Sequence, residues 1–236
     1  MLKRIITFFI VTMLCASAAH SLEINYNFNH RTCFPQQWYR FPVSAETSPV
    51  QSRDIPKISG AIKKFLSKYP VRVVDENLHG IYIFGELRFF RKDFGGTFRP
   101  GKIYLRFNPA RFGDWPALSV RQLHHEFSSV LMKNHRFPKS KWISNNKGNY
   151  VSRDKGRDML GSLGRDEHNY LFKQGFLTSY GSADFENDVN IYAEYVFVFP
   201  GKLKRIGKRH PAVAKKSKII KDFYCRIDRS FFFCQK

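Results

Sequence analysis

The chain has 236 residues and a formal net charge of +21, from 40 Lys and Arg against 19 Asp and Glu. This length suits one domain with a sizeable hydrophobic core. The charge favours loose association with anionic surfaces such as phospholipid headgroups, lipopolysaccharide or teichoic acid. Such an excess does not by itself indicate a specific nucleic-acid site, and we expect none.

The first 21 residues have the three parts of a signal peptide. Lys3 and Arg4 precede an apolar run from residue 5 to about residue 18, and small residues follow at Ala19 and Ser21. The run is too short to span a membrane comfortably, and no later stretch approaches the required length. We therefore predict an exported protein, periplasmic or secreted, that is not an integral membrane protein and forms a single domain over residues 22–236.

Export permits disulfide bonds, and three cysteines follow the predicted leader: Cys33, Cys225 and Cys234. Cys225 and Cys234 are able to close a short C-terminal loop, or one of them pairs with Cys33. One cysteine is left over in either case. No CxxC pair indicates a cysteine zinc site.

The first half of the chain is expected to contain a strand, a helix and a small sheet. The strand is predicted over residues 23–29, a looping segment over 33–54, and a helix over 59–69 that ends before Pro70. Short segments rich in β-branched and aromatic residues then predict strands at residues 71–74, 80–84, 87–90 and 102–107. With a turn at Gly95 and Gly96, they indicate a small, mainly antiparallel sheet.

Residues 119–135, SVRQLHHEFSSVLMKNH, combine helical periodicity with metal-binding chemistry. One face of the predicted helix is apolar and is directed into the core by Leu123, Phe127, Val130 and Leu131. On another face, His125 and Glu126 match the first half of H-E-x-x-H, in which two histidines bind zinc and the glutamate activates a water. Ser129 stands where the second histidine belongs.

The second half of the chain predicts a loop and further helices. Residues 140–165 are rich in Lys, Asn, Gly and Ser and indicate a mobile surface loop. Residues 184–199 predict an amphipathic helix with a polar ridge of Glu186, Asn190 and Glu194 at i, i+4 and i+8. The ridge is either a source of metal ligands or a solvated face. Residues 200–236 form a basic tail with a helix over about 211–226.

Two segments carry a resemblance to a known family. LHHEFSSVL, at 123–131, resembles the LHHEF-small-H-I-L active helix of a group of exported bacterial proteins classed as zinc metallopeptidases. GFLTSYGSADFENDVNIYAE, at 175–194, is similar to their downstream Gly-Phe…Tyr-Ala…EDFAE segment. The likeness covers about residues 123–199 and implies a zincin-like α+β fold, a zinc cofactor and a peptide or protein substrate. It also implies that His125 is a ligand and Glu126 the general base.

The chain departs from that group at both remaining ligand positions. Ser129 replaces the second histidine, and either alignment of the downstream segment puts an amide, Asn187 or Asn190, where the glutamate ligand belongs. Glu186 and Glu194 are the carboxylates left to reach a metal beside His125.

Other side chains complete the set of candidates. His124 or His168 is available as an additional nitrogen donor, and Tyr180 is a candidate oxyanion stabiliser. The sequence thus predicts a zinc-dependent peptidase or a divergent member without activity. The alternative is a non-catalytic basic protein that binds peptides or anionic cell-envelope polymers.

Overall fold

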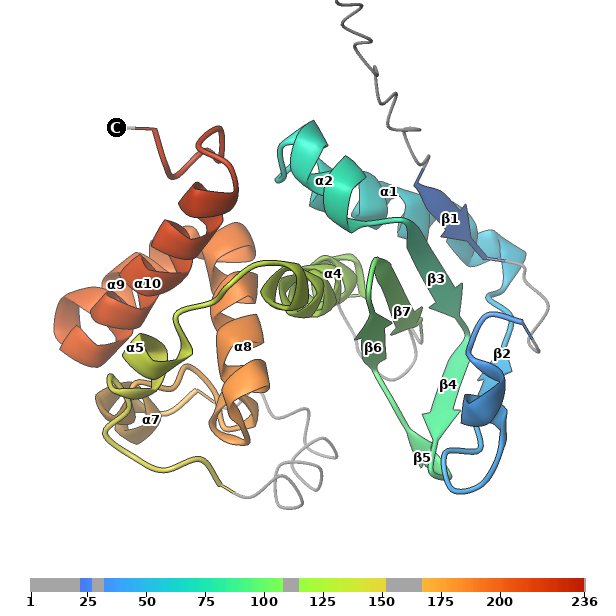
Figure 1. Cartoon of the computed structure of the whole chain (residues 1–236), viewed down its shortest axis with the longest axis horizontal. Helices are drawn as coiled ribbons and strands as arrows, with labels where there is room; N and C mark the ends of the chain where they lie inside the picture. The colour runs from blue at the N-terminus through green and yellow to red at the C-terminus, as the bar shows by residue number, and fades with distance from the viewer. Residues whose placement is uncertain (1–21, 27–31, 108–114, 152–166, 236) are drawn as a thin grey trace, which may run out of the picture.

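A computed structural model describes residues 22–26, 32–107, 115–151 and 167–235. The described residues form an α+β structure in which strands dominate the first half and helices the second. The long helix α4 (Trp115–Asn134) lies between the two halves (Figure 1). Of the described helices, none has both the length and the apolar character needed to cross a lipid bilayer. The predicted signal peptide at residues 1–21 lies outside the described residues.

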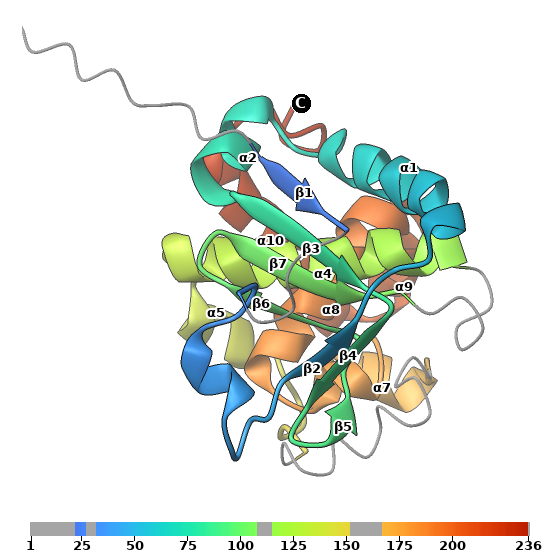
Figure 2. The same ribbon diagram turned by 90° about the vertical axis from the view of Figure 1, so that its right-hand side faces the viewer.

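The larger sheet has four strands in the order β1-β3-β7-β6. Its members are β1 (Glu23–Asn25), β3 (Gly80–Phe84), β7 (Lys102–Arg106) and β6 (Gly96–Arg99). β3 pairs in parallel with both β1 and β7, whereas β6 pairs antiparallel with β7. Figure 2 shows this sheet in front of α4 and α8. The prediction of a mainly antiparallel sheet is therefore wrong for this sheet. The segment with α1 and α2 returns the chain in parallel from β1 to β3, and the segment with β4, β5 and β6 does so from β3 to β7.

A second, antiparallel sheet has three short strands in the order β2-β4-β5. They are β2 (Glu46–Ser48), β4 (Glu86–Phe89) and β5 (Lys92–Asp93). The segment predicted to loop therefore contains β2, and also two short 3-10 helices, η1 (Gln36–Tyr39) and η2 (Ser52–Asp54). Gly95 lies in a bend between β5 and β6, but the turn predicted to include Gly96 is wrong there, since β6 begins at Gly96.

Two helices form the crossover between β1 and β3. α1 (Ile55–Leu66) agrees with the predicted helix and begins earlier, whereas α2 (Val71–Asn77) lies where a strand was predicted. The strand prediction for residues 71–74 is wrong because Pro70 starts a new helix and packing outweighs the β propensity of valine. Val73 and Val74 are buried, and the Asn77 side chain donates to the Val73 carbonyl at 2.9 Å.

The C-terminal half is helical. Its elements are α5 (Lys139–Ile143), α7 (Asn169–Gln174), η4 (Tyr180–Ser182), α8 (Phe185–Val198), α9 (Pro200–Arg209) and α10 (Pro211–Ile227). The Asp184 side chain caps α8 by accepting from the Asn187 N–H at 2.9 Å. The predicted loop at 140–165 contains α5, and its residues from 152 onward lie outside the described part of the chain.

α4 is central to the main hydrophobic core. It packs against α1 on one side and α8 on another, and it also contacts β6 and β7. The predicted apolar face is confirmed, because its four side chains are buried in this core, namely Leu123, Phe127, Val130 and Leu131. Burial of this face fixes the rotation of α4 and so fixes where His125 and Glu126 point.

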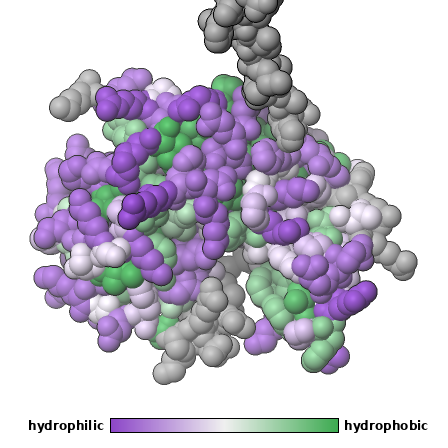
Figure 3. Space-filling model, in the orientation of Figure 1, coloured by the Kyte–Doolittle hydropathy of each residue, from purple (hydrophilic) through white to green (hydrophobic). Residues whose placement is uncertain are grey.

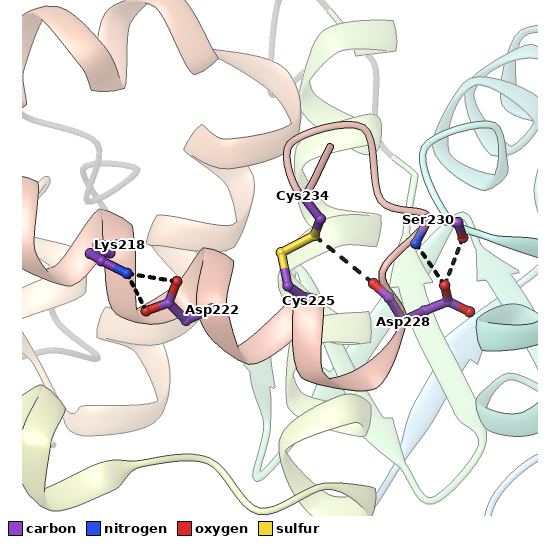
Figure 4. Close-up of a disulfide and its surroundings, with 6 residues drawn as sticks. All are labelled: Lys218, Asp222, Cys225, Asp228, Ser230 and Cys234. Carbon is purple, nitrogen blue, oxygen red and sulfur yellow. Dashed lines mark hydrogen bonds and ion pairs between the residues drawn. A yellow bond between two sulfur atoms is a disulfide. The ribbon is translucent and has the colours of Figure 1, made fainter. Parts of the chain in front are cut away.

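One of the two predicted disulfide arrangements is present. Cys225 and Cys234 are bonded, with their Cα atoms 5.7 Å apart, at the C-terminal end of the chain (Figure 4). Cys33 is buried and forms no disulfide with another described cysteine. Its Sγ lies 3.3 Å from the Tyr39 hydroxyl, and burial raises the pKa of this thiol. The bond therefore ties the tail to the end of α10 rather than to the N-terminal half.

Removal of this bond is expected to have a moderate effect on stability. The Cys225→Ser/Cys234→Ser variant should unfold with a free energy lower by about 2–3 kcal/mol, because the bond closes a short loop in the unfolded chain. Urea denaturation followed by circular dichroism measures the difference. A reductant should lower the stability of the wild-type chain by a similar amount and leave the variant unchanged. An equal response of both proteins to the reductant would contradict the prediction.

Candidate functional site

α4 and α8 bring the predicted site residues together. His125 Nδ1 lies 2.9 Å from Glu194 Oε1, so the carboxylate favours the tautomer with its proton on Nδ1. One turn along α4, the Ser129 hydroxyl donates to Glu186 Oε1 at 2.8 Å. The Asn190 amide in turn donates to the Ser129 hydroxyl at 2.7 Å. The polar ridge of α8 therefore faces α4 and is not a solvated surface.

Glu194 is held by a second partner that the sequence analysis missed. Arg121 Nε donates to Glu194 Oε2 at 2.7 Å, so each carboxylate oxygen has its own donor. The guanidinium also lies 5.1 Å from the centre of the Phe199 ring. Arg121 precedes His125 by one helical turn, a spacing that places both side chains on one face. That spacing was the available signal for its role.

Glu126 is the unusual carboxyl group of the site. Glu126 is only 9 % exposed, and no described residue donates a hydrogen bond to its carboxyl group. Burial raises the pKa of Glu126 to about 7, with the charges of Glu186 and Glu194 adding to the rise and His125 opposing it. A carboxyl group in this range is able to give or accept a proton at neutral pH.

Tyr180 lies beside this pair. Its ring stacks on the His125 imidazole with 5.8 Å between centroids. Burial raises the pKa of the Tyr180 hydroxyl, and the negative charge of Glu126 raises it further. The hydroxyl therefore stays protonated and available as a hydrogen-bond donor, which is the chemistry that an oxyanion stabiliser requires.

The edge strand β6 runs directly over Glu126. A Cβ atom at Gly96 would lie 2.8 Å from Glu126 Oε1, and one at Gly95 would lie 2.9 Å from Gln122 Nε2. Both glycines therefore permit the close approach of strand and helix. No other described strand pairs with the outer side of β6. The sequence analysis did not predict this strand, because the glycine pair was interpreted as a turn.

The outer edge of β6 exposes backbone groups next to the site. The Arg106 N–H donates to the Gly95 carbonyl at 2.9 Å, which sets the alternation of hydrogen bonds between β6 and β7. In an antiparallel pair, alternate residues direct their N–H and C=O groups to the partner strand. Gly96 and Phe98 consequently direct theirs away from β7, toward the open side.

The donor set of this site does not fit a zinc ion of the predicted type. Ser129 supplies a hydroxyl where an imidazole is needed, and that hydroxyl is bonded to Glu186 and Asn190. The Glu194 carboxylate is bonded to Arg121 and His125. Among the described residues, no three His, Cys, Asp or Glu side chains are grouped as metal ligands.

Three other histidines have partners away from His125. His124 Nδ1 lies 2.8 Å from the Tyr69 hydroxyl in the core, where burial lowers its pKa to about 3 and keeps it neutral. His168 lies at the start of α7, exposed and stacked on Tyr170. His135 Nε2 lies 3.0 Å from the Asn77 side-chain oxygen. None of these contacts directs a further imidazole to His125.

Comparison with models of known protein families, with curated proteins and with solved structures finds no match to this chain. The resemblance of residues 123–199 to zinc metallopeptidases therefore stays a prediction. The function has to be argued from the geometry of α4, α8 and β6.

A second feature lies away from these residues. A cavity of about 500 Å³ is bordered by α7 and α9, and its lining includes four cationic side chains, Lys202, Arg205, Lys208 and Arg209. Glu167 also lines it, accepting a hydrogen bond from Lys202 Nζ at 2.6 Å and another from the Tyr195 hydroxyl. This lining suits an anion, in line with the alternative prediction of anionic polymers, but a strongly basic chain produces such clusters without a specific ligand.

Proposed function

We propose that this protein binds an extended peptide along the outer edge of β6, beside His125 and Glu126, and that it does so without zinc. The observation that carries the proposal is the position of the Glu126 carboxyl group. Its Oε1 atom lies 2.8 Å from the place that a Cβ atom at Gly96 would occupy. A ligand strand added to β6 would therefore lie next to this buried carboxyl group, to which no described residue donates a hydrogen bond. The predicted zinc peptidase remains the second candidate.

Strand addition explains how such a ligand is held. The outward N–H and C=O groups of Gly96 and Phe98 are available to pair with a peptide backbone. Alternate side chains of an added strand face alternate sides of the sheet. Those on the α4 side would meet Glu126 and the Tyr180 hydroxyl, so these two groups would select the peptide while the strand edge holds it.

The charge around the site indicates which peptides are preferred. The carboxylates of Glu126, Asp184, Glu194 and Glu186 all act on Tyr180 and raise its pKa. The site is therefore locally negative within a chain of net charge +21. We expect a peptide with Lys side chains to bind better than its Glu counterpart, although the net charge of the protein favours the opposite order.

The arrangement favours binding over hydrolysis. In a zinc hydrolase, the metal lowers the pKa of a bound water that the glutamate then deprotonates. Here a serine and an asparagine occupy the positions from which the remaining ligands are expected, and each is hydrogen-bonded within the site. His125 is hydrogen-bonded to Glu194, which fixes the position of its imidazole.

Amide hydrogen exchange tests the proposal directly. A blocked decapeptide of alternating Thr and Lys is expected to slow exchange at the Gly96 and Phe98 amides, because they gain partners, while the Thr97 and Arg99 amides are already paired with β7. The same peptide N-methylated at alternate residues cannot pair with β6 and serves as the control. Equal protection by both peptides, or none at β6, would rule out strand addition.

A variant pair tests the same edge by affinity. Gly96→Val places a side chain against Glu126 and should weaken decapeptide binding roughly tenfold or more, whereas Thr97→Val on the opposite face should leave it nearly unchanged. Thermal unfolding shows whether both variants fold. If Gly96→Val does not fold, the hydrogen-exchange experiment on the wild-type chain still tests the proposal. Addition of EDTA should change nothing. Stoichiometric zinc with peptide cleavage that Glu126→Gln abolishes would establish the peptidase instead.

A further inference from the structure

Two adjacent loops form an exposed aromatic tip at one end of the β2-β4-β5 sheet. We define the aromatic tip as residues 40–44 together with Phe90, Arg91 and Lys92 at the β4–β5 turn. The Phe90 N–H donates to the Val43 carbonyl at 2.6 Å, which joins the two loops. Phe41 is 88 % exposed and Phe90 is 48 % exposed. Figure 3 shows a hydrophobic area at the lower right, in the region where Figure 1 places β2, β4 and β5.

The backbone of the tip is strained. Phe89 pairs with Lys92, so Phe90 and Arg91 alone form the turn between β4 and β5. Their φ angles are 53° and 58°, and Ser44 in the neighbouring loop has a φ of 47°. Two-residue turns of this kind strongly favour Asn-Gly, because bulky side chains rarely adopt positive φ. A phenylalanine and an arginine retained there suggest a role for their side chains outside the fold.

Cationic residues flank the two exposed phenylalanines in the sequence. Arg40, Arg91 and Lys92 are exposed, and no described acidic group lies within ion-pair distance of them. The acidic residues of the same sheet are already paired: Arg88 and Arg106 together bind Glu46, Glu86 and Asp93. The tip is therefore both apolar and positively charged.

A rigid aromatic cluster lies beneath the tip. The Trp38 ring contacts Phe89 edge-on, with 5.4 Å between centroids, and stacks on Phe34 at the same distance. Phe89 also contacts Phe94 at 5.1 Å. This base holds the two loops in fixed positions, so that Phe41 and Phe90 project from the molecule without a large loss of conformational entropy on contact.

We propose that the aromatic tip docks on an anionic phospholipid surface. Aromatic rings favour the headgroup level of a bilayer, and Arg and Lys beside them pair with lipid phosphates. Phe41 and Phe90 enter this level, while Arg40, Arg91 and Lys92 contact the headgroups. The tip projects as two joined loops and is not a groove, which suits a flat lipid surface rather than an enclosed peptide. The docking leaves the β6 edge uninvolved and does not depend on the proposed peptide binding.

Vesicle sedimentation tests this docking on the chain from residue 22, which contains every described element. We expect binding to vesicles of phosphatidylcholine with about one-third phosphatidylglycerol, and much weaker binding to phosphatidylcholine alone. Phe41→Ser/Phe90→Asn should lower the partition coefficient roughly tenfold or more. Asn suits positive φ, so this variant keeps the turn. The matched control, Val71→Ser/Tyr170→Ser, removes two exposed apolar side chains elsewhere and should change it less than about twofold.

Fluorescence locates the contact on the protein. Brominated lipid should quench the emission of Trp38, which lies beneath the tip, and Trp38→Phe should remove most of the quenching. A tip variant that binds vesicles as well as the wild-type chain would overturn the proposal in favour of general charge attraction, and equal losses in the tip and control variants would overturn it in favour of unspecific apolar contact. A tip variant that binds vesicles normally but loses the Thr–Lys decapeptide would overturn it in favour of a peptide contact.

Discussion

Replacement of Lys216 by Met is expected to lower the free energy of unfolding by about 3–5 kcal/mol, because it leaves Asp188 as a buried charge without a counter-ion. Lys216 lies on α10, is 0 % exposed, and donates to Asp188 Oδ2 at 2.5 Å. Its other hydrogen bonds go to the Gly175 carbonyl at 2.8 Å and to the Asn146 side chain at 2.7 Å. All three ammonium protons therefore have acceptors.

Three aromatic rings enclose the same ammonium group. The centroids of Trp142, Phe176 and Tyr192 lie 4.7, 5.0 and 5.1 Å from Lys216 Nζ. Asp188 Oδ2 also accepts from Trp142 Nε1 at 2.8 Å. The ion pair thus joins α5, α8 and α10. Urea denaturation measures the loss, and Lys215→Met, the same change at the exposed neighbouring position, should cost far less.

The pH dependence of the Lys216→Met variant is a further test of the same cause. Burial raises the pKa of Asp188, and Lys216 opposes that rise. Without Lys216 the folded state favours the protonated acid more strongly, so stability should fall as pH rises from the acidic range to pH 8. Lys216→Met/Asp188→Asn removes the unpaired charge and should recover part of the loss. If Lys216→Met and Lys216→Met/Asp188→Asn lost the same free energy of unfolding at every pH, the unpaired Asp188 charge would not be the cause.

Periodicity in the sequence was sufficient to identify the helices that carry the site. The apolar face of residues 119–135 predicted α4, and the periodicity of residues 184–199 predicted α8. The pattern left open whether the polar ridge of α8 was a source of metal ligands or a solvated face, and its contact with α4 comes from the structure. The same reasoning would have found Lys216, since it lies one turn before Ile219 and Ile220, both buried on α10. It was missed because a lysine in a basic tail is normally solvated.

Strand pairing and backbone geometry could not be predicted in the same way. The parallel pairing of β3 with β1 depends on the path of α1 and α2, which local propensity does not encode. Gly95 and Gly96 have the composition of a turn, and their close approach to α4, which explains why glycines begin this edge strand, is visible only in the structure. Likewise, the positive φ angles of Phe90 and Arg91 contradict the preferences on which a turn prediction depends.

The Glu126→Gln variant is expected to be more stable than the wild-type chain at pH 8, by about 3 kcal/mol, the free energy that corresponds to a pKa raised from 4.5 to about 7. Between these two values the folded state binds more protons at Glu126 than the unfolded state does. Stability therefore falls as pH rises through this range, and the full penalty is present above about pH 7. A glutamine cannot ionise, so the variant avoids the penalty.

The gain should vanish near pH 4.5, where Glu126 is protonated in the folded state and close to half protonated in the unfolded chain. Thermal and urea unfolding at pH 4.5, 6 and 8 measure this trend. Glu76→Gln removes the same charge from the exposed surface of α2 and should show no such increase. If Glu126→Gln is more stable but no longer prefers Lys peptides, the buried carboxyl group serves binding and lowers the stability of the fold. A Glu126→Gln gain that is equal at all three pH values would mean that ionisation of Glu126 is not its cause.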